Sequence, residues 1–301
     1  MFNYIFSHFF ISQTMDHCLL LYKNSEVSYY KFGSGTKTAI CFHGFGEDGT
    51  LYSFLEKYAA KEYTFYSIDL PFHGKTEWNE GIIFSPQDLL HIIAEILCLN
   101  NQQPTTMHSI LRINDAPHPP DKLTFIGFSL GGRIALSLYQ HKPEIAEKII
   151  LLAPDGLKVN FWYWLATQTW IGNKFFSISM KYPGFFFSFL KAINNMGLVN
   201  TSVFKFVNYY IGNKSARQLL YQRWTGLRKI KPNLPRIKHF IRQYKTPTRL
   251  VYGKHDRIIL PVRGELFQKG IEEFCTLTVI ASGHQVVHEN HAEEILAALL
   301  H

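Results

Sequence analysis

Short apolar runs alternate with amphipathic stretches along most of the chain. Eight of the runs are rich in β-branched, aromatic and aliphatic residues, which is typical of strands: residues 18–22, 27–32, 38–42, 64–69, 122–128, 148–153, 248–253 and 277–281. Several of them are apolar on both faces, as strands buried in a parallel sheet are.

Stretches with helical spacing of apolar residues lie between the strands, at residues 51–60, 86–99, 133–140, 262–271 and 292–300. Alternation of strand and helix predicts an α/β fold, with a doubly wound, mostly parallel sheet of eight strands and helices on both faces. Because the first two strands are close together in sequence, we expect them to pair as an antiparallel hairpin at one edge.

Two segments break this alternation. Residues 100–121 are polar and proline-rich where a short connection would suffice, and we interpret them as a surface insertion. Residues 155–245 carry 20 aromatic residues without a strand pattern, which indicates a helical cap inserted between two strands. The predicted organisation is a core of residues 16–154 and 246–301, a cap of residues 155–245 and a loosely ordered extension of residues 1–15.

Composition is that of a folded protein, with 47% hydrophobic and 18% charged residues in 301. The apolar opening, residues 1–15, lacks a basic start and a cleavage site, so it makes a poor signal peptide; Met15 is an alternative start. Four cysteines are scattered singly, which favours a reducing compartment. We expect a cytoplasmic protein, with peripheral contact to the inner face of the membrane left open.

Positive charge is concentrated in the predicted cap. Residues 155–245 contain 15 Lys and Arg and one acid, Asp155, whereas the rest of the chain has 16 Lys and Arg and 22 Asp and Glu. Such a surface favours anionic partners, either an anionic lipid surface or an acidic carrier protein. Nucleic acid is not expected, because no binding module accompanies the charge.

The motif G-x-S-x-G occurs at residues 127–131, where a predicted strand ends and a helix begins at Leu130. Gly127 and Gly131 lack the side chains that would clash at a sharp turn, so Ser129 can project its hydroxyl from a strained backbone beside a helix N-terminus. This motif resembles the nucleophile elbow of the α/β-hydrolase superfamily.

The resemblance implies a Ser, acid, His order along the chain, with each residue at a strand end. Asp256 follows the strand 248–253 and His284 follows the strand 277–281, each shortly after a glycine. The resemblance extends over residues 18–154 and 246–301.

The sequence "HGF" at residues 43–45 is similar to the superfamily's oxyanion loop. This similarity implies that the backbone N–H groups of Phe45 and Leu130 hold an oxyanion, while His43 and Gly44 order the loop. "DLPFHG" at residues 69–74 resembles another turn of the superfamily, with Phe72 where glycine is usual.

The resemblance implies a serine hydrolase that cleaves a carboxylic ester, thioester or related acyl bond of an apolar small molecule without a metal or organic cofactor. Two alternatives stay open: a lyase or C–C hydrolase using the same triad, and a non-catalytic ligand-binding protein. Arg133 weakly supports the first, because "GGR" resembles the menaquinone-pathway lyases of this fold. An exposed helix arginine is the interpretation we favour for it.

Other polar residues compete for roles in the site. Asp155 follows the sixth strand and is the rival to Asp256 as the acid of the triad, whereas Asp48 and Asp69 precede Ser129 and do not fit the expected order. Four further histidines lack the spacing of a metal site, and we expect structural or surface roles for them: His73, His255, His288 and His291.

Overall fold

A computed structural model of the chain describes residues 15–101, 122–159, 161–184, 188 and 213–301. Most of the predicted extension 1–15 and of the predicted insertion 100–121 lies outside these residues, so neither prediction is tested. The aromatic stretch 185–193 of the predicted cap also lies largely outside them.

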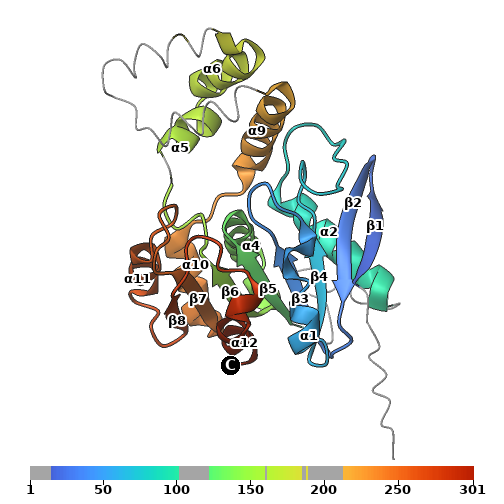
Figure 1. Ribbon diagram of the computed structural model, residues 1–301, viewed down its shortest axis with the longest axis vertical. Helices are drawn as coiled ribbons and strands as arrows, with labels where there is room; N and C mark the ends of the chain where they lie inside the picture. Colours follow the sequence, from blue (N-terminus) through green and yellow to red (C-terminus); the bar gives the residue numbers. More distant parts are fainter. Residues whose placement is uncertain (1–14, 102–121, 160, 185–187, 189–212) are drawn as a thin grey trace, which may run out of the picture.

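An eight-stranded sheet forms the centre of the molecule, with strand order β1-β2-β4-β3-β5-β6-β7-β8 (Figure 1). β2 is antiparallel to β1 and to β4, and all other neighbours are parallel. The predicted fold class and the edge hairpin are thereby confirmed. The strands are β1 (Asp16–Tyr22), β2 (Ser25–Phe32), β3 (Lys37–Phe42), β4 (Tyr63–Ile68), β5 (Leu123–Phe128), β6 (Ala146–Leu152), β7 (Thr248–Gly253) and β8 (Cys275–Ile280).

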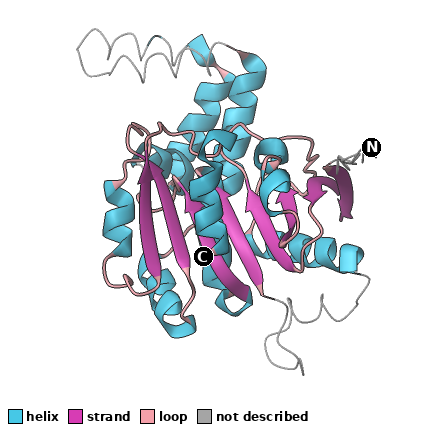
Figure 2. Cartoon of the chain, turned by 60° about the horizontal axis from the view of Figure 1, so that its bottom comes forward, coloured by secondary structure: helices cyan, strands magenta, loops and turns pink. Residues whose placement is uncertain are grey.

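Helices cover both faces of the sheet (Figure 2). α4 contacts α2 and α10, whereas α1 contacts α12. The helices of these layers are α1 (Leu55–Ala59), α2 (Pro86–Asn101), α4 (Leu130–His141), α10 (Leu234–Tyr244), α11 (Val262–Gln268) and α12 (Ala292–Leu300). Short 3₁₀ turns occur at η1 (Gly49–Tyr52), η2 (Pro143–Ile145), η3 (Leu227–Lys229) and η4 (Glu289–His291).

The middle strands lie fully inside the core. Every residue of β5 is buried, as are the last four residues of β3 and the last five of β6. Because parallel strands are covered on both faces, such continuous apolar runs are what this position in a sheet requires. The carboxyl ends of β5, β6, β7 and β8 consequently lie at one edge of a rigid layer.

Among the described residues, three further helices stand beyond that edge, α5 (Phe161–Gln168), α6 (Trp170–Lys181) and α9 (Lys214–Gly226) (Figure 1). α6 contacts both α5 and α9. α10 falls within the range predicted as cap, yet Ile237 and Ile241, one turn apart, are fully buried in the main core. This helix therefore packs with the sheet layers, and its apolar stripe is the reason. None of the helices in the described ranges is long and apolar enough to cross a membrane.

Replacing Ile241 tests the place of α10. Ile241→Ala is expected to lower the free energy of unfolding by about 2–5 kcal/mol, because a buried side chain is lost from the core. Ile171→Ala, at a side chain that is 75% exposed, should change it by less than about 0.5 kcal/mol. Urea denaturation measures both, and equal small losses would contradict the packing of α10 on the core.

Candidate active site

Ser129 occupies the turn between β5 and α4 with φ 49° and ψ −112°. This conformation is one that non-glycine residues rarely adopt, and it costs about 1–3 kcal/mol. Neighbouring backbone holds it in place: the Ser129 N–H donates to the Leu152 carbonyl at 2.9 Å, and the Ser129 carbonyl accepts from Gly132 at 2.9 Å and from Asp155 at 2.8 Å. The sheet and the start of α4 together therefore fix the turn.

Gly131 allows the first turn of α4 to lie against the end of β3. A Cβ at this position would collide with the Phe42 carbonyl oxygen, and it would also crowd the His43 carbonyl. Gly127 lies opposite the backbone of Gly131 in the same turn. This close approach brings the loop after β3 beside Ser129.

His284 joins Ser129 to Asp256. Its Nε2 lies 3.1 Å from Ser129 Oγ, and its Nδ1 lies 2.8 Å from Asp256 Oδ2. An ionised carboxylate accepts only, so Nδ1 carries a proton and the Nε2 of the neutral ring is left to accept the serine hydroxyl. The three predicted side chains thus form one continuous hydrogen-bonded chain, although they lie far apart in sequence.

Asp256 is held rigidly. Its side chain is fully buried, and Oδ1 accepts the backbone N–H groups of Ile258 at 2.7 Å and Ile259 at 2.9 Å. Gly253, at the end of β7, lies so close to the Gly283 carbonyl that a Cβ there would collide with it. This approach places the turn that carries Asp256 beside the turn that carries His284.

The loop after β3 is ordered by a buried histidine. His43 Nε2 accepts the Leu70 N–H at 3.0 Å, so the proton of the neutral ring sits on Nδ1, which donates to the Gly44 carbonyl at 2.8 Å. Burial lowers the pKa of His43 and keeps the ring neutral. His43 and Gly44 lie where the sequence predicts a loop-ordering pair.

Glu47 is a site residue that the sequence analysis did not identify. Its Oε2 accepts the Gly44 N–H at 3.1 Å, and burial raises its pKa. A Cβ on Gly44 would crowd both this carboxylate and the Phe128 ring. The carboxylate therefore fixes the backbone immediately before Phe45, and an acidic residue in a polar loop gave no signal of this contact.

Phe72 and Arg223 join the core to the cap. Phe72 has φ 66°, the left-handed conformation that explains why glycine is usual there in the superfamily. Its carbonyl accepts from Arg223 Nε at 2.8 Å, and its ring lies against Gly226 at the end of α9. The Arg223 guanidinium also lies 5.3 Å from the ring centroid of Phe45.

Arg133 is buried, so the expectation of an exposed helix arginine is wrong. It is 8% exposed because the first turn of α4 lies beneath α5, where its guanidinium stacks 4.7 Å from the Tyr163 ring centroid. Its Nε lies 3.5 Å from Asp155 Oδ2. Asp155 thus pairs with Arg133, whereas His284 pairs with Asp256.

Asp69 and Asp48 support loops. Asp69 is fully buried and accepts from the backbone of Gly49 and Lys75 and from the hydroxyl of Ser28, and Asp48 caps η1. His73 Nδ1 donates to the Pro71 carbonyl, and His288 caps η4. Within the described part of the chain, no three potential metal ligands cluster together.

The sequence profile of the alpha/beta hydrolase fold family matches residues 38–291. The chain belongs to this family. The match runs from the start of β3 to the end of η4, so it includes the turn that carries Ser129 as well as the loops that carry Asp256 and His284. The fold resemblance inferred from the motifs is confirmed.

Relatives of this alpha/beta hydrolase are distant. "Uncharacterized hydrolase YugF" of Bacillus subtilis (strain 168) is 27% identical over 122 residues, which are 40% of this chain and 38% of that protein. The pimeloyl-[acyl-carrier protein] methyl ester esterase of Wigglesworthia glossinidia brevipalpis is 23% identical over 236 residues, 77% of this chain and 79% of that protein.

Solved structures agree on the fold. A structure reported for carboxylesterases of the thaumarchaeon Nitrososphaera gargenis has a TM-score of 0.61 and 16% identity, covering 94% of this hydrolase and 97% of that chain. The thioesterase domain from the curacin biosynthetic pathway has a TM-score of 0.58 and 16% identity, and the match covers 95% of this chain and 99% of that chain.

The buried His73 makes the stability of the fold depend on pH. Burial lowers the pKa of His73 to about 2 from its ordinary 6.5. The unfolded chain therefore binds a proton at pH 5 that the folded chain does not, and stability is lost as pH falls below 6.5. His73→Asn should reduce the average slope of unfolding free energy between pH 6.5 and 5 by about 1 kcal/mol per pH unit. Urea unfolding at both pH values measures it, and an unchanged slope would contradict a neutral His73.

Proposed function

We propose that the protein is a serine hydrolase that cleaves a carboxylic ester, thioester or related acyl bond. The observation that supports this proposal most is the hydrogen-bonded chain from Asp256 through His284 to the strained Ser129. A serine hydroxyl is a weak nucleophile until a base takes its proton, and this arrangement supplies an oriented base.

The proposed reaction begins with attack of Ser129 Oγ on the substrate carbonyl. His284 Nε2 takes the hydroxyl proton and then delivers it to the leaving group, while Asp256 stabilises the charged imidazole. Water, activated by the same histidine, releases the acyl group from Ser129.

The oxyanion of the reaction requires two donors. We assign this role to the N–H of Leu130, at the start of α4, and to the N–H of Phe45, after the loop that His43 and Glu47 hold. Each donor of this kind contributes about 3–4 kcal/mol to lowering the barrier. The contact of Gly131 with the end of β3 supports their proximity, because it joins the two loops.

The substrate we propose has an apolar acyl group. α5, α6 and α9 beyond the edge of the sheet are rich in aromatic side chains, and such surroundings favour an apolar ligand. The relative from Wigglesworthia glossinidia brevipalpis is named a methyl ester esterase of an acyl group on an acyl-carrier protein, which supports an acyl ester as the substrate class.

Removal of the nucleophile is the first test. Ser129→Ala is expected to lower kcat toward p-nitrophenyl acyl esters at least about 10⁴-fold, because no acyl-enzyme can form. Ser137→Ala, at a buried serine within α4, the helix that follows Ser129, should retain nearly all activity. Steady-state rates across acyl-chain lengths measure both, and activity that survives in the Ser129 variant would contradict the proposal.

Asparagine substitution separates the two candidate acids. Asp256→Asn is expected to lower kcat about 10⁴-fold with the fold intact, because the amide no longer fixes the productive tautomer of His284. Asp155→Asn should keep kcat within about tenfold, since its carboxylate faces Arg133. Circular dichroism serves as the folding control, and the reverse order of losses would assign the acid to Asp155.

A further inference from the structure

Helix α6 turns an apolar stripe toward solvent. Trp170 and Ile171 are 76% and 75% exposed, and Phe175 and Ile178 are more than 40% exposed. At 3.6 residues per turn these four side chains share one side of the helix with the exposed Lys174 and Lys181. We call this stripe the outer face of α6.

The other side of α6 faces the rest of the cap. Ser179 and Met180 are buried there, and Phe176 packs against Tyr221 and Trp224 of α9. α6 thus has one apolar side packed against the protein and a second apolar side left outward, where an ordinary surface helix is polar. Exposed apolar patches of this kind mark a binding surface.

Charge around the outer face has a single sign. The described cap helices α5, α6 and α9 contain five Lys and Arg and no Asp or Glu. Asp155, which precedes these helices, lies against Arg133. A partner that docks on the outer face meets the exposed Lys174 and Lys181 of α6 itself, which favours an anionic partner.

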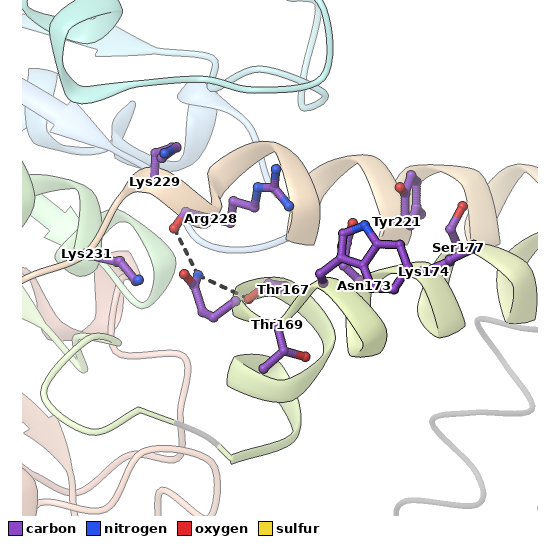
Figure 3. A pocket seen from close by; sticks show the side chains of 11 residues that line it. Thr167, Thr169, Asn173, Lys174, Ser177, Tyr221, Arg228, Lys229 and Lys231 are labelled. Carbon is purple, nitrogen blue, oxygen red and sulfur yellow. Dashed lines mark hydrogen bonds between the residues drawn. The ribbon is translucent and has the colours of Figure 1, made fainter.

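An open surface cavity of about 700 Å³ adjoins the outer face (Figure 3). Trp170 and Lys174 line it and also belong to the face, while Arg228, Lys229 and Lys231 supply further positive charge. Ser177 adds a hydroxyl donor, whereas the Thr169 hydroxyl already donates to the Leu165 carbonyl. Cations together with a hydroxyl group suit the oxygens of a phosphate group.

We propose that the outer face of α6 docks on an anionic phospholipid membrane, with a headgroup phosphate at the neighbouring cavity. Trp and Ile would enter the boundary between headgroups and acyl chains, and the interleaved lysines would meet the headgroups. Large exposed aliphatic and aromatic side chains among lysines favour a membrane over an acidic protein, because the cores of protein interfaces are depleted in lysine.

Vesicle flotation of the full chain tests this docking. The Ser129→Ala protein is used so that binding is independent of turnover and of the proposed reaction. We expect binding to vesicles of phosphatidylcholine mixed with phosphatidylglycerol, little binding to phosphatidylcholine alone, and release at high salt because exposed charges are screened.

Variants of the outer face have matched controls. Ile171→Ser should weaken binding about tenfold or more, whereas Leu21→Ser, at a similarly exposed leucine of β1, should not. The double variant Lys174→Glu with Lys181→Glu should also weaken vesicle binding at least about tenfold. The same double charge change at Lys61 and Lys75, two exposed lysines of the core, should leave most of the vesicle binding intact.

Four results would overturn the proposal. The first is that the protein shows no preference for anionic vesicles, and the second is that Ile171→Ser lowers thermal stability but leaves flotation unchanged. The third is that the protein is a dimer which Ile171→Ser dissociates. The fourth is that the protein binds an acidic acyl-carrier protein but not vesicles, and that Ile171→Ser removes this binding. The last three would assign the outer face to the chain itself, to a second copy or to a protein partner.

Discussion

The backbone of Ser129 depends on close contact between the first turn of α4 and the end of β3, a contact that only glycine at position 131 permits. The strain of φ 49° persists because Leu152 and Asp155 bond the same residue from the neighbouring strand end. A parallel sheet delivers the carboxyl ends of its strands to one edge, so loops after β5, β7 and β8 meet there. The alignment of Asp256, His284 and Ser129 follows from that constraint.

Cations connect this edge to the cap. Arg223 of α9 bonds the Phe72 carbonyl of the core, and Arg133 of α4 stacks on Tyr163 of α5. The Asp155 carboxylate lies beside the Arg133 guanidinium, next to the strained turn, and stabilises this cation of the core. These two contacts join α9 and α5 to the loops around Ser129. The exposed lysines of α6 and α9 face solvent.

Much of the fold could be predicted because its signals are local. Most strand runs are rich in apolar residues, and Ser129, Asp256 and His284 lie close to glycines at strand ends, where the G-x-S-x-G motif and the residue order of the superfamily indicate them. Other features depend on tertiary packing. Nothing near Arg133 in sequence indicates that Tyr163 will cover it, and nothing near Glu47 indicates its bond to the Gly44 amide. α10 carries an apolar stripe typical of any amphipathic helix, so its place in the core needed the structure.

Covalent labelling with a fluorophosphonate, followed by peptide mass spectrometry, tests most directly whether the aligned side chains activate the serine. Such probes react with a serine whose proton is taken by a neighbouring base. The account predicts one stoichiometric label, located on Ser129 and abolished when His284 is replaced by alanine in a protein that still folds. A folded protein that stays unlabelled, or that carries its label on another serine, would contradict it.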